Sequence, residues 1–365
     1  MNTLIIGNLS DQKFISKTKP IFDLEYIKKV YIFRSNGNVY KKNKKAIYKN
    51  FLFGNYNSKF ILFRLIYDFF NFLFFLYLSK IKKIDLIIGI YLYPHALYAS
   101  VLSKLTNTPL IILLPGSDLK KLIKTRRNID LFKNANFLGV RGSNSLNNLL
   151  NIGFEKEKLF IHHNQFDIKN FTFYNNSNKI YDIIVFSILR KPKRVDVAIN
   201  LIFNLKKDFP DIKCLIYGSG SEKKSLIRHA SSLDLEKNIV FKDFKNESTV
   251  TLLNSSKIFL MTSKSEGLPM TLVESMSCGI PAVVSNINDI SDLVKNNYNG
   301  YLVDPNNYND YLNSLKKLLS DDDKRILFSI NARNTIEKMH KKHYSNNSLI
   351  NSWDLLIKKC VNLQT

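Results

Sequence analysis

The strongest constraint on the fold is the segment 257–285, which reads KIFLMTSKSEGLPMTLVESMSCGIPAVVS. Its apolar run from Ile258 to Thr262 has the length of a buried parallel strand. Pro269 suits the first turn of a helix and Gly279 is a typical helix-ending residue, so a helix is predicted between them. A second apolar run follows at Val283. The segment therefore predicts a strand–turn–helix–strand unit of a parallel α/β domain.

Two carboxylates lie in this unit, Glu266 on the turn and Glu274 inside the predicted helix. A helix start holds phosphate well because its first amides are unpaired, and Gly267 allows a close approach to the backbone. A carboxylate accepts two hydroxyls, as in a sugar or a ribose. The pattern predicts a sugar-nucleotide site, with Glu266 near the hexose and Glu274 near the ribose. The alternative is a generic α/β segment whose two Glu are solvated.

The motif S-x-x-EGLPMTLVESMSCGIPAVV resembles the donor-binding signature of the retaining glycosyltransferases of family 4. The E-x7-E spacing, the GLP and the M-x-x-G-x-P tail, which Ala282 and Val283 follow, all match. The resemblance implies the GT-B fold, an α/β class with two Rossmann-like, doubly wound parallel-sheet domains facing across a cleft. The further donor-binding candidates on this motif are Leu268, Pro269, Met270 and Thr271.

A chain of 365 residues is too long for one core and suits two domains. Strand–helix alternation in both halves predicts an N-terminal acceptor-side domain at 1–171 and a donor-binding domain at 181–345. The polar, Asn-rich stretch between them, 172–180, is the predicted linker. The family's C-terminal helix crosses back onto the first domain, and the amphipathic segment 346–365 is expected to do so here.

After the first strand of the second domain the sequence reads FSILRKPKRVDVAI, where the family has G-R-L-x-x-x-K-G. Lys193 occupies the Lys position, but Ser187 and Ile188 replace the Gly and the Arg. Arg190 or Arg194 could supply the missing cation. These cations would stabilise the charge that grows on the leaving diphosphate. Solvated surface lysines are the alternative for this run.

The candidate catalytic residues are thus Lys193, Arg190 and Glu266, and both Glu are expected to bind rather than to act as nucleophiles. No metal and no other cofactor is expected, because cations and helix amides already face the diphosphate. The sequence offers no Asp-x-Asp that is expected to hold a metal, because the run Asp321 to Asp323 is interpreted as solvated charge in a polar loop.

Weaker signals mark the rest of the site. Gly218 in IYGSGSEKKSL matches the family's G-x-G turn near the nucleotide, and Phe244 falls where the family lines its base pocket. A core aromatic is an equal alternative for Phe244. On the acceptor side, Gly116 and Asp118 in LLPGSDL resemble the family's H-G-x-D loop. His95 follows a predicted strand and could position an acceptor hydroxyl or be a structural loop histidine.

The chain is strongly basic, with 54 Lys and Arg against 30 Asp and Glu and a net charge of +24. Part of this excess fits an AT-biased coding background. The positive field still favours anionic partners such as nucleotides or an anionic membrane surface. Nucleic acid competes, but nothing resembles a nucleic-acid module, so none is expected. The lysine clusters are Lys41, Lys42, Lys44 and Lys45, then Lys80, Lys82 and Lys83, then 120–127.

The most apolar stretch is 60–78, FILFRLIYDFFNFLFFLYL, which Arg64, Asp68 and Asn71 interrupt. A spanning helix needs about 20 consecutive apolar residues, so no span is predicted. Two interpretations remain open and are compatible. The helix is buried against the N-terminal sheet, or it dips one face into a bilayer while neighbouring lysines contact lipid headgroups.

Cysteine usage and the N-terminus bear on location. Cys214, Cys278 and Cys360 are odd in number and lack metal spacing, which favours buried free thiols in a reducing cytosol. The start, MNTLIIGNLSDQ, has no basic leader before a long apolar core, so a secretory signal is not expected. The predicted location is cytoplasmic, at the inner face of the cytoplasmic membrane.

The resemblance implies a retaining enzyme that moves a hexose from a nucleoside-diphosphate sugar to a hydroxyl of a glycan or lipid-linked saccharide. Charge and composition favour bacterial surface polysaccharide assembly, such as capsule, O-antigen or lipopolysaccharide. Two alternatives remain. One is a sugar-nucleotide epimerase with the same GT-B fold, and the other is a non-catalytic basic protein that binds membrane or nucleic acid.

Overall fold

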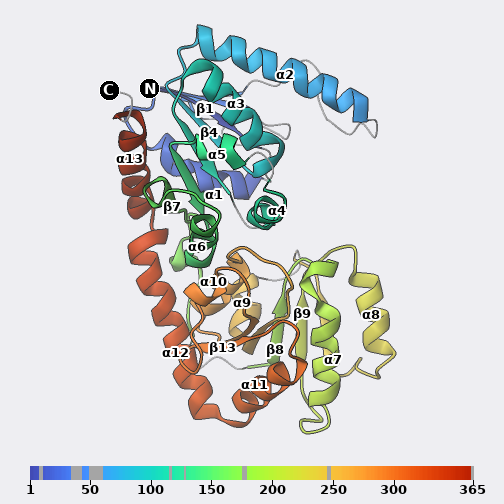
Figure 1. Cartoon of the computed structure of the whole chain (residues 1–365). Coiled ribbons are helices and arrows are strands. Elements are labelled where there is room, and N and C mark those ends of the chain that lie inside the picture. Colours follow the sequence, from blue (N-terminus) through green and yellow to red (C-terminus); the bar gives the residue numbers. More distant parts are fainter. Residues whose placement is uncertain are drawn as a thin grey trace. The chain divides into compact units, whose positions relative to one another are not determined.

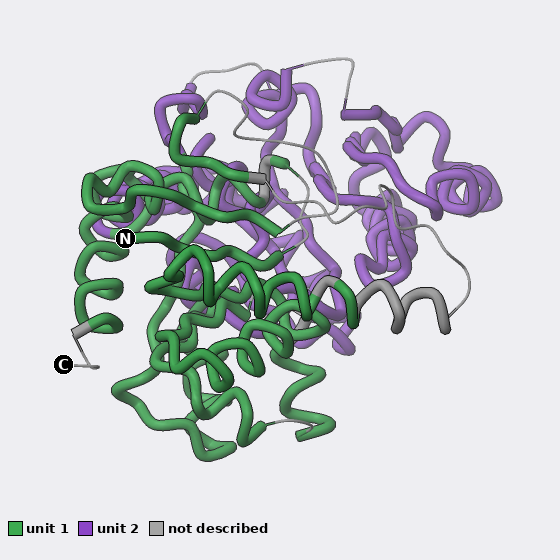
Figure 2. Tube along the Cα trace, turned by 90° about the horizontal axis from the view of Figure 1, so that it is seen from above, with its two compact units in different colours: residues 1–166, 343–365 green, residues 167–342 purple. Residues whose placement is uncertain are grey.

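The computed structural model describes residues 1–7, 11–33, 43–48, 61–114, 117–126, 129–174, 179–244 and 248–362. The chain forms two compact units, shown in Figure 2. Unit 1 comprises residues 1–166 and 343–365, and unit 2 comprises residues 167–342. The boundary between the units thus follows Phe166. The amide of Phe166 donates to the carbonyl of Tyr344 at 3.4 Å, so the two segments of unit 1 are bonded to each other next to this boundary. Part of the segment expected as a linker, 175–178, lies outside the described residues.

Unit 1 is built on a seven-stranded parallel sheet in the order β3-β2-β1-β4-β5-β6-β7 (Figure 1). Its strands are β1 (Asn2–Ile6), β2 (Lys29–Phe33), β3 (Ala46–Tyr48), β4 (Leu86–Ile90), β5 (Leu110–Leu113), β6 (Phe137–Val140) and β7 (Leu159–Ile161). Its α-helices are α1 (Asp11–Phe22), α2 (Ile61–Ile81), α3 (Leu97–Thr106), α4 (Ser117–Thr125), α5 (Ile129–Lys133), α6 (Ser143–Asn151) and α13 (Asn346–Asn362).

Helices cover both faces of this sheet. Alternate residues of each buried strand point to opposite faces, so each face presents apolar side chains that pack against helices. In β1, Leu4 and Ile6 join an apolar cluster with α2 to α6. Ile5 joins a second cluster with α1 and α13, which includes the buried Trp353. The segment after residue 342 is therefore part of the core of unit 1.

Unit 2 has a six-stranded parallel sheet in the order β10-β9-β8-β11-β12-β13. Its strands are β8 (Tyr181–Phe186), β9 (Cys214–Tyr217), β10 (Ile239–Lys242), β11 (Ser256–Met261), β12 (Ala282–Ser285) and β13 (Gly300–Val303). Its α-helices are α7 (Val195–Leu205), α8 (Lys223–Ser231), α9 (Thr249–Asn254), α10 (Met270–Ser277), α11 (Tyr308–Ser320) and α12 (Asp322–Met339). The chain order reverses between β8 and β11, which makes this pair the switch point where open α/β sheets bind ligands.

The predicted fold class is confirmed, since both halves are parallel α/β sheets covered by helices. The prediction that the cysteines are buried free thiols is also confirmed for Cys214, Cys278 and Cys360. The prediction that Asp321 to Asp323 lie in a loop was wrong, whereas the exposure of Asp322 and Asp323 agrees with solvated charge. The Asp321 side chain accepts from the amide of Lys324 at the start of α12, and the next two residues lie in its first turn, where acidic side chains complement the helix dipole.

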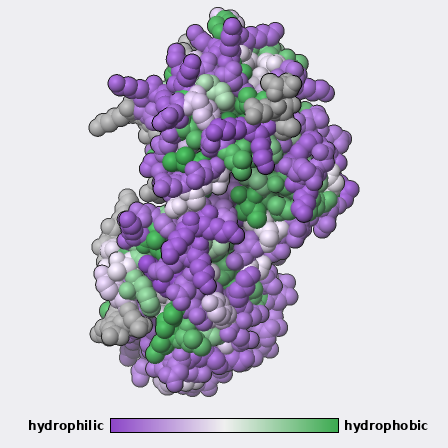
Figure 3. Space-filling model, turned by 90° about the vertical axis from the view of Figure 1, so that its left-hand side faces the viewer, coloured by the Kyte–Doolittle hydropathy of each residue, from purple (hydrophilic) through white to green (hydrophobic). Residues whose placement is uncertain are grey.

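None of the helices in the described residues combines the length and the hydropathy needed to cross a membrane. Figure 3 shows one face of the molecule, on which hydrophilic residues dominate and apolar residues form separate patches.

Candidate functional site

The candidate site lies at the carboxyl edge of β8 and β11, the two strands of the switch point in unit 2. A short helical turn, Lys191–Lys193, follows β8, and the Glu-bearing turn follows β11. The two loops are bonded to each other. The Thr262 hydroxyl donates to the carbonyl of Arg194 at 2.7 Å. The backbone amide of Lys264 donates to the carbonyl of Pro192 at 2.9 Å. Their side chains are therefore held at one place.

Lys193 and Glu266 form an ion pair at this place. The Ser263 hydroxyl donates to the same Glu266 Oε1 at 3.0 Å, and the Asn288 side-chain amide donates to the Glu266 backbone carbonyl. Both members of the ion pair are largely shielded from solvent. The structure thus brings together two residues that the sequence assigned to different parts of a donor, and it pairs them with each other.

The predicted helix after this turn is α10, and the structure confirms its position. Pro269 is the residue before its first turn, and Gly279 ends the motif with a left-handed φ of 67°. No side chain caps α10 at its start. The first amides, on Met270 and Thr271, are therefore available to an anion, and the helix dipole adds a positive potential there.

Glu274 lies in the second turn of α10. Burial raises the pKa of its carboxyl group from the ordinary 4.5 to about 7. Its carboxylate has neither a hydrogen-bond nor an ion-pair partner among the described residues. A desolvated acid without a partner costs stability when it ionises, so such groups are typical of binding sites rather than of cores.

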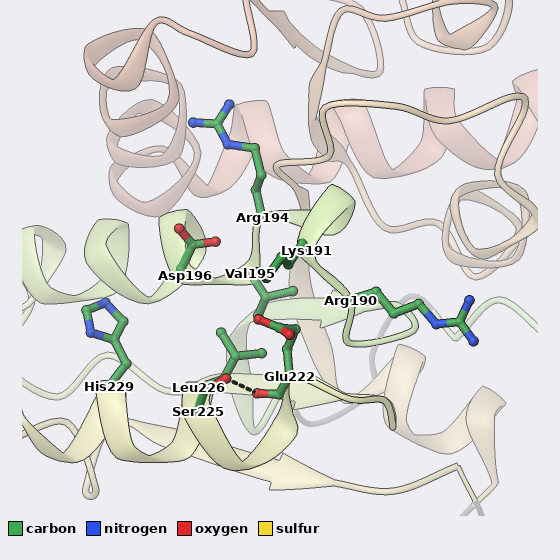
Figure 4. Close-up of a pocket in the computed structure, with 9 residues that line it drawn as sticks. All are labelled: Arg190, Lys191, Arg194, Val195, Asp196, Glu222, Ser225, Leu226 and His229. Atoms are coloured by element: carbon green, nitrogen blue, oxygen red, sulfur yellow. Dashed lines mark hydrogen bonds between the residues drawn. The ribbon is translucent and has the colours of Figure 1, made fainter. Parts of the chain in front are cut away.

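The structure separates the two candidates for the missing cation. The Arg194 guanidinium donates from Nη1 to the carbonyl of Pro305 at 2.6 Å, so it holds the loop before α11. Arg190 is exposed and has no such bond within the described part of the chain. Figure 4 shows both residues at a pocket of about 420 Å³ between the starts of α7 and α8, with their guanidinium groups pointing in different directions. Arg190 is therefore the remaining candidate.

Gly218 and Gly220, of the G-x-G turn after β9, lie against the loop that carries Arg190. A Cβ on Gly218 would be 1.8 Å from the carbonyl oxygen of Ser187, and one on Gly220 would be 2.2 Å from that of Leu189. The amide of Leu189 donates to the carbonyl of Ser219 at 2.9 Å. These glycines therefore permit the close approach of two backbone segments at the edge of the site.

Replacing Gly218 with alanine is expected to displace the loop after β8. The new methyl group would overlap the backbone oxygen of Ser187, which cannot turn away as the end of a flexible side chain could. We expect a loss of about 2–4 kcal/mol in the free energy of unfolding. Urea denaturation measures this loss. The matched control is Ser219→Ala at the exposed position beside it, which adds no atom. A Gly218→Ala protein as stable as the wild type would show that the two loops do not pack as described.

Phe244 follows β10, and its ring is partly exposed. It packs edge-on against Tyr217 at a centroid distance of 5.2 Å. The Tyr217 hydroxyl lies 3.1 Å from the Thr249 hydroxyl and 3.4 Å from the backbone oxygen of Phe244. The ring thus belongs to an aromatic cluster, and its suggested place at a nucleotide base stays a prediction.

The acceptor-side candidates belong to unit 1. His95 lies in a helical turn, Leu92–Ala96, directly after β4. Its Nδ1 is buried without a hydrogen-bond partner, and burial lowers the pKa of the ring to about 4, so it is neutral at pH 7. Gly116 lies outside the described residues. Asp118 lies in α4, but its side chain is also outside the described part.

Two residues of the site were not predicted. Ser263 could have been found, because a hydroxyl three residues before a Glu is a common pairing within one turn. Asn288 gives no such signal, since it comes 22 residues after Glu266 on the loop that follows β12. Within the described ranges, no three His, Cys, Asp or Glu side chains gather as metal ligands would.

Comparison with known proteins gives a match to a family model and to several relatives. The family described as "Glycosyl transferases group 1" matches residues 167–335. The poly(ribitol-phosphate) alpha-N-acetylglucosaminyltransferase of Staphylococcus aureus (strain COL) is 30% identical over 234 residues, 61% of this chain and 46% of the relative. The UDP-Gal:alpha-D-GlcNAc-diphosphoundecaprenol alpha-1,3-galactosyltransferase of Escherichia coli is 32% identical over 128 residues, 35% of this chain and 33% of the relative. The chain therefore spans less than half the length of both.

Among solved structures, HepE of Anabaena in complex with UDP superposes with a TM-score of 0.76 at 18% identity. The match covers 98% of this chain and 100% of that one. At this identity the likeness establishes the fold, which is GT-B.

Proposed function

We propose that this chain, whose residues 167–335 match the group 1 glycosyltransferases, moves a hexose from a nucleoside-diphosphate sugar to a hydroxyl group with retention of configuration. One observation carries the proposal. A lysine and a glutamate lie paired beside the uncapped start of α10, and a second, half-buried glutamate without a partner lies one turn further on. Lys193 and the start of α10 match a diphosphate, Glu266 matches a hexose, and Glu274 matches a ribose.

Donor binding would exchange the partners of this ion pair. The Lys193 ammonium turns to the diphosphate, which the first amides of α10 also hold. Glu266, released from Lys193 and still fixed by Ser263, accepts hydroxyls of the hexose. Glu274 accepts the two ribose hydroxyls, which supply the partners that it lacks.

The reaction breaks the bond between the anomeric carbon and the phosphate oxygen, and negative charge grows on the leaving diphosphate. Lys193 and Arg190 stabilise this charge, commonly by a few kcal/mol for each well-placed donor. The acceptor hydroxyl attacks on the face that the diphosphate leaves and passes its proton to the departing phosphate oxygen. Neither Glu266 nor Glu274 forms a covalent bond in this scheme.

The relatives suggest the substrates. UDP is named with the Anabaena structure, and UDP-galactose and a diphosphoundecaprenol acceptor are named for the Escherichia coli relative. We therefore favour a UDP-sugar donor and a glycan or lipid-linked saccharide acceptor in bacterial surface polysaccharide assembly. His95, Gly116 and Asp118 are the proposed acceptor-side residues. The proposed location is the inner face of the cytoplasmic membrane.

A donor screen tests the proposal. The chain is incubated with a panel of nucleotide sugars and a bacterial lipid extract, and transfer is followed with radiolabelled sugar. NMR of the product then gives its anomeric configuration. We expect transfer from a UDP-sugar with the α configuration kept. Free epimer without transfer would identify an epimerase, and a lack of stabilisation by every nucleotide would support a non-catalytic protein.

Transfer is expected to be independent of divalent metal, because Lys193, Arg190 and the α10 amides serve the diphosphate. Addition of EDTA should leave the initial rate unchanged, and added Mg²⁺ or Mn²⁺ should not raise it. A metal-dependent glycosyltransferase treated in parallel is the positive control. A rate abolished by EDTA and restored by Mn²⁺ would contradict the metal-free scheme.

A further inference from the structure

Helix α2 of unit 1 is apolar on two sides. Its inner side packs into the core, where Phe75 and Leu78 are buried and the Phe75 ring lies 4.5 Å from that of Phe33. Phe72 contacts Tyr98 of α3, with ring centroids 6.3 Å apart. Figure 1 shows α2 beside α3 on the outside of this unit. The buried interpretation of the sequence is therefore right for one face of the helix.

The other face carries exposed apolar side chains, Phe70 among them, and four of these are spaced four residues apart along one side of the helix. We call them the outer stripe: Phe69 (59% exposed), Leu73 (42%), Tyr77 (63%) and Ile81 (52%). A helix that is apolar on both sides is normally covered on both sides. Single exposed apolar residues are common on soluble proteins, but a continuous row of large ones indicates an interaction surface.

The charges around the stripe indicate what covers it. Residues 69–83 contain three lysines, Lys80, Lys82 and Lys83, and no Asp or Glu. All three lysines are exposed, at or just beyond the end of the helix where the stripe ends. Aromatic and aliphatic side chains next to lysines suit the boundary between acyl chains and anionic headgroups, and each lysine near such a surface is attracted to it.

We propose that the outer stripe of α2 docks on an anionic lipid bilayer, with its apolar side chains in the acyl boundary and Lys80, Lys82 and Lys83 on lipid phosphates. Tyr77 has an amphipathic ring, of the kind that lies at headgroup level. This contact would place the unit that holds the proposed acceptor-side residues at the surface where lipid-linked acceptors reside. It does not depend on sugar transfer, because it uses no residue of the donor site.

Binding of the full chain to vesicles tests the stripe. Flotation is measured with phosphatidylglycerol–phosphatidylcholine vesicles and with phosphatidylcholine alone, without nucleotide. We expect binding to the anionic vesicles, weakened at least ~10-fold by the double substitution Leu73→Glu and Tyr77→Glu. The matched control is Leu327→Glu with Leu355→Glu, on α12 and α13, which are similarly exposed at 56% and 58%. The control should bind as the wild type does.

Lysine variants test the headgroup contact. Lys80→Glu, Lys82→Glu and Lys83→Glu together should lower binding by at least ~10-fold at low salt. Changing Lys224, Lys237 and Lys338 of unit 2 to Glu alters the net charge equally and should have little effect. Equal losses in the two triple variants would show that net charge alone attracts the protein to lipid, and would overturn the proposal.

A fluorescence measurement locates the stripe without disrupting it. The native Trp353 is buried, so a Tyr77→Trp variant adds one exposed reporter. Its emission should shift to the blue on anionic vesicles and be quenched by brominated lipid. The proposal would be overturned if the emission did not shift, or if the Leu73→Glu, Tyr77→Glu protein bound vesicles as well as the wild type. It would also be overturned if the wild type formed a dimer that the Leu73→Glu, Tyr77→Glu substitutions dissociate, because a second copy would then cover the outer stripe.

Discussion

Replacing Lys193 with alanine is expected to lower kcat/KM for sugar transfer by about 10²–10³-fold, because a preorganised cation is lost where charge develops on the diphosphate. The folded protein should tolerate the change. Glu266 keeps its bond from the Ser263 hydroxyl at 3.0 Å and stays partly in contact with solvent. The substitution therefore removes a catalytic interaction, while the Glu266 carboxylate keeps its hydrogen bond from Ser263.

The matched control for Lys193 is Lys191→Ala, on the same helical turn. Lys191 is exposed and has no ion pair with any described residue, so its loss should change the rate by less than about threefold. Initial rates over a range of donor and acceptor concentrations separate kcat from KM. If Lys193→Ala and Lys191→Ala were equally active, Lys193 would not serve the leaving group.

Replacing Glu274 with glutamine is expected to have two opposite effects. Nucleotide affinity should fall by about 10²-fold, because two hydrogen bonds to a charged acceptor are weakened. The ligand-free protein should become more stable at pH 8. Ionisation of the half-buried Glu274 carboxyl group, whose pKa is raised to about 7, lowers the stability of the wild type by at most about 3 kcal/mol. Glutamine does not ionise, so the variant does not lose this stability.

The sign of this pH dependence follows from the raised pKa of Glu274. The folded state holds the proton more tightly than the unfolded state, so the carboxyl group opposes folding progressively as the pH rises from its ordinary 4.5 to about 7. The melting temperatures of the wild type and of Glu274→Gln should therefore agree near pH 4.5 and diverge up to about pH 7. Ribose hydroxyls favour the charged form, so UDP affinity of the wild type should rise over the same interval.

Thermal melts at a series of pH values and calorimetric titration of UDP measure both effects. Glu25→Gln, an exposed position in unit 1, is the matched control and should change neither. A Glu274→Gln protein that is less stable than the wild type at pH 8 would show that the carboxylate has a structural partner. Unchanged UDP affinity would place the ribose elsewhere.

The sequence predicted the parts of the site that lie close together in the chain. Glu266, Pro269 and Glu274 belong to one motif, and the strand, turn and helix that carry them are where the motif placed them. The strand β3 (Ala46–Tyr48) was not predicted, because three residues are too few for a pattern to be seen. The strand β13 (Gly300–Val303) was also not predicted, because its run is short and begins with a glycine.

Contacts between distant residues could not be predicted. The choice between Arg190 and Arg194 depends on the carbonyl of Pro305, 111 residues from Arg194. The ion pair of Lys193 with Glu266 depends on the pairing of β8 with β11, which no local pattern reveals. For α2, local periodicity left two interpretations open, and only the burial of its described side chains, residues 69–70 and 72–81, shows that both faces are apolar.

The most direct test of the donor site is a crystal structure of the protein with UDP. We expect the diphosphate at the first amides of α10, the ribose hydroxyls on Glu274 and the Lys193 ammonium moved from Glu266 to a phosphate oxygen. A nucleotide bound away from α10, with the ion pair of Lys193 and Glu266 intact and Glu274 without a ligand, would contradict the proposed function.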